Sequence, residues 1–157
     1  MDCLDWLSSY EKGKKKMKKM LNTAMIYFVL AITAGVFYRE FTKINGFFGR
    51  TVLGYLHTHL FVLGMFLFLI LSLFCNQEAG LAESKKFKRF YLLYNISLPF
   101  MVCMMMVRGI MQVLELELTK STNAMISGIA GISHILITIS LFMLFSALKK
   151  SPTDRKK

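Results

Sequence analysis

Two histidines stand two residues apart in the run from Gly54 to Gly64, GYLHTHLFVLG. This run lies near the start of a longer apolar stretch, Thr51 to Cys75, and the third histidine, His134, lies in another apolar stretch. Ionisable side chains at membrane depth are costly and usually functional. His57, His59 and His134 are therefore the residues best suited to chemistry, because an imidazole can bind a metal or relay a proton.

The composition places these histidines in a membrane protein. The chain has 157 residues, is 55% hydrophobic and contains 14 Phe and 12 Met. Its net charge of +11 is concentrated between and outside the apolar runs. Such clusters are typical of membrane topology signals and of contact with anionic lipids, and no nucleic-acid-binding motif accompanies them. Cys3, Cys75 and Cys103 are far apart in sequence and predict neither a disulfide framework nor a zinc motif.

Four apolar runs predict four membrane-spanning helices, because lipid offers no partner for backbone polar groups. Short connections between the runs predict an all-α, up-down-up-down four-helix bundle. The expected transmembrane domain is 21–150, between a basic segment 1–20 and a basic tail 151–157. The expected spans are 21–38, 51–75, 90–114 and 123–148.

Basic residues set the expected orientation. They concentrate in the N-terminal segment, in the loop between the second and third spans, and in the C-terminal tail. Basic residues prefer the cytoplasmic side, so we expect both termini there, in a multi-pass protein of the cell (plasma) membrane. The first apolar run then acts as a signal anchor. The residues Asp2 to Leu7 would form a short interfacial turn or remain disordered.

The depth of three polar side chains points to one site. From the outer ends of their spans, His57 lies about 9 Å deep, His134 about 16 Å and Arg108 roughly 10 Å. Two neutral imidazoles from separate helices can ligate a six-coordinate heme iron, and four-helix bundles hold such sites in their cores. We therefore predict heme b with His57 and His134 as axial ligands. Arg108 would pair with the heme propionates, with Gln112 one turn further on the same face.

Small residues beside the histidines fit a flat ligand. Gly54 and Gly64 lie on the helical face of His57, and Gly131 lies three residues before His134. Glycine leaves room for a macrocycle, although small residues also let transmembrane helices approach closely. His59 lies about 200° around the helix from His57 and cannot ligate the same iron from a straight helix. A hydrogen bond to a neighbouring helix, a second cofactor, a subunit interface and a proton path are its alternatives.

The sequence offers little support for other chemistry. No carboxylate pair lies inside a span, and there is no nucleophile–base pair, phosphate-binding loop or zinc motif. Hydrolase and transferase functions are therefore unsupported, and whether the chain is an enzyme, such as an oxidoreductase component, stays open.

The run Leu53 to Gly64 resembles the low-spin heme-ligand helix of heme–copper oxidase catalytic subunits, in which an HT dipeptide corresponds to His57-Thr58. Residues 17–150 also resemble a family of small uncharacterised bacterial four-helix membrane proteins. That second resemblance rests on GVFYREF from Gly35, HTH from His57, VRGI from Val107 and SGIAGISH from Ser127. It implies four spans and a heme role. The oxidase centre needs further histidines for copper and a second heme, whereas this chain has 3 in total. The resemblance thus implies a heme unit without the copper site.

Together these observations predict a membrane heme b protein in electron transfer or in heme or gas sensing. Its expected partners are anionic lipids, a second copy of the chain, and a redox partner or quinone. A homodimer could supply further ligands in trans, including His59. One alternative is a non-enzymatic membrane interaction or heme-handling subunit. Another is a small proton-coupled transporter that uses the histidines as a relay.

Overall fold

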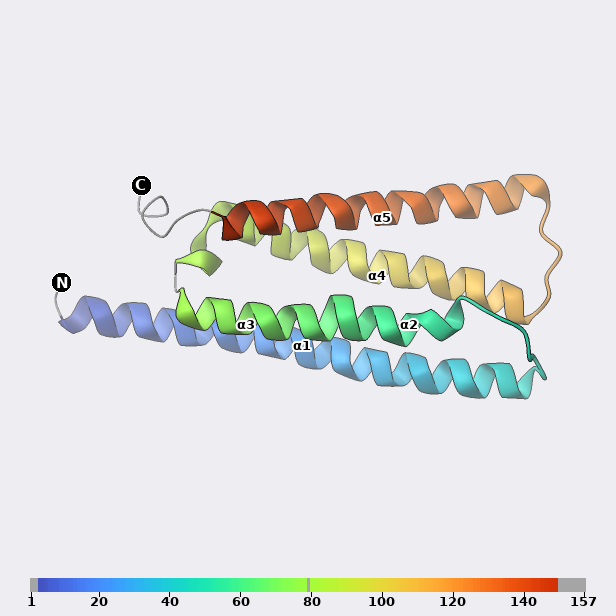
Figure 1. The fold of residues 1–157 in the computed structure, drawn as a ribbon, viewed down its shortest axis with the longest axis horizontal. Coiled ribbons are helices and arrows are strands. Elements are labelled where there is room, and N and C mark those ends of the chain that lie inside the picture. The colour runs from blue at the N-terminus through green and yellow to red at the C-terminus, as the bar shows by residue number, and fades with distance from the viewer. Residues whose placement is uncertain (1–2, 79, 150–157) are drawn as a thin grey trace.

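The computed structural model describes residues 3–78 and 80–149, and this part of the chain is helical throughout, with short connections and no strand (Figure 1). Each of four successive helical segments is long and apolar enough to cross a membrane. The predicted all-α fold with four antiparallel spans is thereby confirmed. The first span lies in α1 (Cys3–Ile44). The second consists of α2 (Leu53–His59), the π-helix η1 (Leu60–Phe66) and α3 (Leu67–Gln77). After the short 3-10 helix η2 (Leu81–Glu83), the third and fourth spans are α4 (Lys85–Val113) and α5 (Lys120–Leu148).

The helices extend beyond the predicted apolar runs. The α1 backbone is helical from Cys3, so the expected interfacial turn is part of a long helix instead, except for Asp2, which lies outside the described residues. Lysine is a good helix former, so its solvated side chains allow α1 to continue past the membrane boundary. Similarly, α4 begins at Lys85, where Ser84 caps it by accepting a hydrogen bond from the Phe87 N–H at 3.2 Å. The predicted tail 151–157 lies outside the described residues.

The second span consists of α2, η1 and α3, and it packs along α1 through close glycine contacts. A Cβ added to Gly64 would lie 2.6 Å from the Tyr27 ring, and one on Gly54 would lie 3.4 Å from the Tyr38 ring. Tyr27 also stacks on Phe68, with ring centroids 5.7 Å apart. The space beside Gly54 and Gly64 is thus filled by tyrosines of α1.

Helix α4 is the central element. It reaches α1 through the hydroxyl groups of Tyr91 and Thr23, whose oxygens are 2.8 Å apart. It reaches the second span where Tyr94 donates to the Leu63 carbonyl at 2.8 Å. Its Gly109 lies against Leu53, and a Cβ there would come within 2.7 Å of the Leu53 backbone nitrogen. These contacts make α1, the second span and α4 one packed unit.

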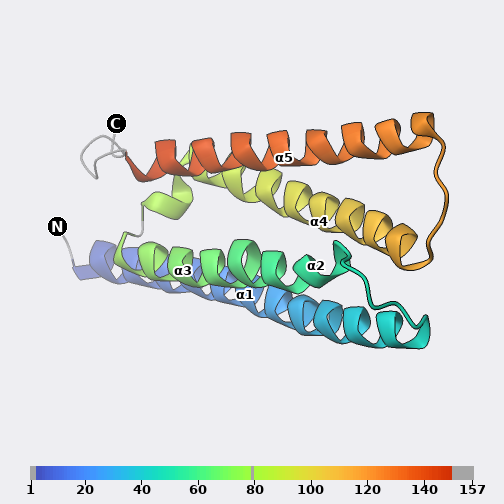
Figure 2. The same ribbon diagram turned by 45° about the vertical axis from the view of Figure 1, so that its right-hand side comes forward.

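Helix α5 packs against α4 and leaves most of its remaining surface exposed (Figures 1 and 2). The buried stripe on α5 includes three small residues among its apolar ones, which lets the two helices approach closely. The stripe consists of Ile126, Ser133, Ile137, Ser140, Leu144 and Ala147. The four spans are therefore not equivalent, since α5 packs on one side of α4 and reaches the shared core through Ile137, Leu144 and Ala147.

Candidate functional site

His57 lies on the face of α2 that packs against α1. Its Cβ and Cγ atoms lie 3.7 and 3.8 Å from the position that a Cβ on Gly35 would occupy. The side chain is half-buried, and its Nδ1 atom is buried without a hydrogen-bond partner in the described part of the chain. Sequence reasoning placed His57 opposite His134, but these contacts direct it toward α1.

His59 and His134 share a different local arrangement. The Nδ1 atom of His59 lies 2.8 Å from the Tyr55 carbonyl oxygen, and that of His134 lies 2.9 Å from the Ala130 carbonyl oxygen. A carbonyl oxygen can only accept, so each contact is a hydrogen bond when Nδ1 carries the proton. The Nε2 atom then keeps its lone pair, which is the form in which imidazole ligates a metal. His59 is half-buried and His134 is exposed.

Arg108 joins α4 to the side of α5 that carries His134. Its Nη1 donates to the Ser127 hydroxyl oxygen at 2.9 Å. His134 follows Ser127 by two helical turns, so the two residues share one face of α5. Arg108 also lines a small cavity of about 120 Å³, together with Gln112 and Asn123.

Gln112 lies beside Arg108 and also contacts another helix. Its Oε1 accepts a hydrogen bond from the Val52 N–H at 2.8 Å and so caps the start of α2 from another helix. Thr51 supports the same junction, since its hydroxyl donates to the Gly109 carbonyl at 3.1 Å. These bonds fix the height of α2 against α4.

The heights of the histidines can be compared along α4. Leu53 meets Gly109, and the neighbouring Arg108 meets Ser127, so Leu53 and Ser127 lie at similar levels. From that level, α2 and α5 both run toward the end of the bundle where α4 begins (Figure 1). At 1.5 Å per residue, His59 lies about 9 Å further along and His134 about 10.5 Å, whereas His57 lies about 6 Å further. His59 and His134 are thus nearly level.

The directions around α4 follow from its three hydrogen-bonded neighbours. Lys86 reaches Ser146 of α5, Tyr94 reaches the second span, and Tyr91 reaches α1. Around the axis of α4, at about 100° per residue, the direction of Tyr94 is about 80° from that of Lys86. The direction of Tyr91 is about 60° further than that of Tyr94 in the same sense. Arg108 itself faces α5, because its guanidinium donates to the Ser127 hydroxyl of that helix.

The same construction on α2 separates its two histidines. Leu53 marks the direction of α4, and His57 is turned from it by about 40° toward α1. His59 is turned by about 120° in the opposite sense, away from α1. His59 therefore points away from both α4 and α1, whereas His57 faces α1.

The three glycines near the histidines differ in the space beside them. Tyr38 and Tyr27 occupy the room beside Gly54 and Gly64, whereas a Cβ on Gly131 would meet nothing within 4 Å. No group of three or more His, Cys, Asp or Glu residues that could hold a metal ion occurs within 3–78 and 80–149. A heme iron does not require such a group, because the porphyrin supplies its equatorial ligands. The exposed His134 and the open flank at Gly131 fit a planar group better than the filled space at Gly54.

Sequence reasoning missed a second polar region at the end of the bundle where α1 begins. A cavity of about 680 Å³ opens there between α1, η2 and α4, and five lysines line it. The sequence predicts that these lysines mark membrane topology and contact anionic lipids, but it does not predict a cavity. The available signal was the four-residue spacing of Lys15, Lys19 and Thr23, which places them on one face of a helix, together with the polar Tyr91 in the third span.

Comparison with known proteins identifies the family but not an activity. Residues 17–151 match the family described as "Protein of unknown function (DUF2871)". Because the match covers most of the chain, the protein belongs to this family. No curated protein and no solved structure matches the chain.

Proposed function

We propose that this member of the DUF2871 family is a membrane heme b protein in electron transfer or heme or gas sensing. The observation that carries the proposal is the matched pair His59 and His134. Both imidazoles hydrogen-bond a carbonyl of their own helix through Nδ1, and both lie at nearly the same level along the bundle. His134 keeps the role expected from the sequence, and His59 replaces His57 as its partner.

The residues around this pair would each perform one task. The carbonyl oxygens of Tyr55 and Ala130 fix the imidazole orientations and make Nε2 the free atom. Arg108 supplies a fixed positive charge for a carboxylate, since its guanidinium is held by Ser127 and stays charged. The open flank at Gly131 leaves room for a ring edge. Heme, when bound, would supply reversible one-electron chemistry.

The first test is the colour of the purified chain. Protein extracted in mild detergent from heme-replete cells is expected to carry about one heme b per chain or per pair of chains, with the absorption spectrum of a low-spin, bis-histidine heme. Reduction by dithionite should sharpen the visible bands without producing a high-spin spectrum. Colourless protein that also fails to bind added hemin would contradict the proposal.

A second candidate function rests on His57. Its buried Nδ1 has no hydrogen-bond partner among residues 3–78 and 80–149, and such a group costs about 1–3 kcal/mol, so a transferable proton is one reason to retain it. This favours the proton-relay alternative. In proteoliposomes with an imposed pH gradient, the relay predicts a proton flux that His57→Ala abolishes and His59→Ala preserves. An equal flux from both variants and from empty liposomes would exclude it.

A further inference from the structure

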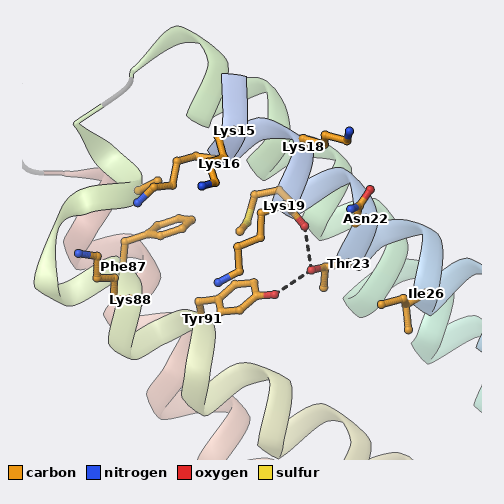
Figure 3. Close-up of a pocket in the computed structure, with 12 residues that line it drawn as sticks. Lys15, Lys16, Lys18, Lys19, Asn22, Thr23, Ile26, Phe87, Lys88 and Tyr91 are labelled. Atoms are coloured by element: carbon orange, nitrogen blue, oxygen red, sulfur yellow. Dashed lines mark hydrogen bonds between the residues drawn. The ribbon is translucent and has the colours of Figure 1, made fainter. Parts of the chain in front are cut away.

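The lysine-lined cavity lies where α1 leaves its basic segment and enters its apolar run. Its wall changes along α1 from lysines to Ile26 (Figure 3), and Met20 also lines it. Met20 is buried, whereas Ile26 is 59% exposed and faces outward. A cationic part beside an exposed aliphatic residue is the arrangement expected where the headgroup and acyl regions of a bilayer meet.

The lining of the cavity is strongly cationic. Lys15, Lys16, Lys18 and Lys19 come from α1 and Lys88 from α4, and none of the lining residues is acidic. In the described part of the chain the recorded ion pair is Arg39–Glu40, which lies at the other end of α1. Concentrated positive charge without carboxylates attracts an anion.

The cavity is also structurally defined, unlike a loose run of surface lysines. The Lys19 ammonium lies 4.2 Å from the centroid of the Tyr91 ring, so this side chain spans from α1 to α4 (Figure 3). The Thr23 hydroxyl donates to the Lys19 carbonyl at 3.0 Å and lies 2.8 Å from the Tyr91 hydroxyl. Phe87, which is 2% exposed, forms the floor on the α4 side. These contacts hold α1 and α4 at a fixed separation around the cavity.

We propose that this cavity binds the phosphate-bearing headgroup of an anionic phospholipid, with Lys16, Lys19 and Lys88 contacting the phosphate. A volume of about 680 Å³ lies within the usual range for small-ligand sites, so it accommodates a headgroup. Basic pockets between transmembrane helices are a recurring form of such sites. A soluble phosphate shares the chemistry, but the exposed Ile26 favours a ligand with an acyl chain. The proposal is independent of heme binding.

The test uses the full chain in detergent micelles and native mass spectrometry. The probes are phosphatidylglycerol, phosphatidylcholine and inorganic phosphate. The chain is expected to retain phosphatidylglycerol in preference to phosphatidylcholine, and millimolar inorganic phosphate should not displace it. The variant Lys16→Gln/Lys19→Gln/Lys88→Gln should bind phosphatidylglycerol about tenfold more weakly than a charge-matched control.

The control is Lys14→Gln/Lys85→Gln/Lys149→Gln, which removes the same charge at the same end from residues that do not line the cavity. Circular dichroism must give equal helicity for both variants; if only the cavity variant loses helicity, Lys88→Gln alone replaces it. Equal loss of phosphatidylglycerol in the two variants would reduce the effect to general surface attraction and overturn the proposal. Displacement by inorganic phosphate would overturn the lipid assignment in favour of a soluble anion.

Discussion

Replacing Phe68 with alanine is expected to lower the free energy of unfolding by about 2–3 kcal/mol. Phe68 is fully buried and its ring contacts Tyr27, Tyr91 and Tyr94, with centroids 5.7, 5.8 and 5.9 Å away. The substitution therefore leaves a cavity where α1, α3 and α4 meet. The expected cost is below the roughly 3–5 kcal/mol typical of water-soluble cores, because lipid is as apolar as the protein interior and only packing is lost.

The matched control is Phe74→Ala on the same helix, since Phe74 is 40% exposed. Reversible unfolding in mixed micelles, followed by circular dichroism, measures both variants. Phe74→Ala should change the free energy of unfolding by less than about 1 kcal/mol. Equal effects from the two substitutions would mean that the ring contacts of Phe68 do not stabilise the packing of α1, α3 and α4.

Alanine substitution of either His59 or His134 is expected to abolish the low-spin heme spectrum. In the proposed site each removal would take away one of the two ligands, so heme affinity should fall by more than the roughly 10- to 100-fold loss seen when an outer-shell partner is removed. His57→Ala should retain the spectrum, because His57 packs against Gly35 of α1. Heme content per chain and the visible spectrum of the reduced protein measure all three variants.

The opposite pattern distinguishes the two ligand assignments. If His57→Ala and His134→Ala lose heme while His59→Ala keeps it, the pairing expected from the sequence is correct and the one drawn from the structure is wrong. External imidazole added to His134→Ala is a further control. Recovery of the low-spin spectrum would attribute the loss to the missing ligand rather than to misfolding.

Much of the fold could be predicted from hydropathy alone. The four spans were found because apolar runs of this length have one structural solution in lipid. The ends were predicted less well, since α1 continues through its lysines to Cys3 and α4 begins at Lys85. Hydropathy locates the membrane boundary, whereas helix ends depend on caps such as Ser84. The side of the membrane on which the termini lie stays a prediction.

For the candidate site, the sequence predicted the position of each residue along its helix but not the direction of its side chain around the helix. Counting residues predicts how far along its helix each histidine lies, because the rise of a helix is constant. The direction of each side chain depends on which helices touch, and that information is not local. The close contact of Gly109 with Leu53 and that of Gly35 with His57 turn α2 so that His57 faces α1. The role of Gln112 was missed for the same reason, since its partner Val52 is distant in sequence.

The seam between α4 and α5 has a mechanical consequence. In the described residues, side-chain hydrogen bonds across it lie near its two ends, from Arg108 to Ser127 and from Lys86 to Ser146. Between them, Ser133 and Ser140 donate to carbonyls of their own helix and leave the seam smooth. A rotation or small slide of α5 would therefore strain these two bonds and would also move Ile137, Leu144 and Ala147, so close packing rather than hydrogen bonding fixes the middle of the seam.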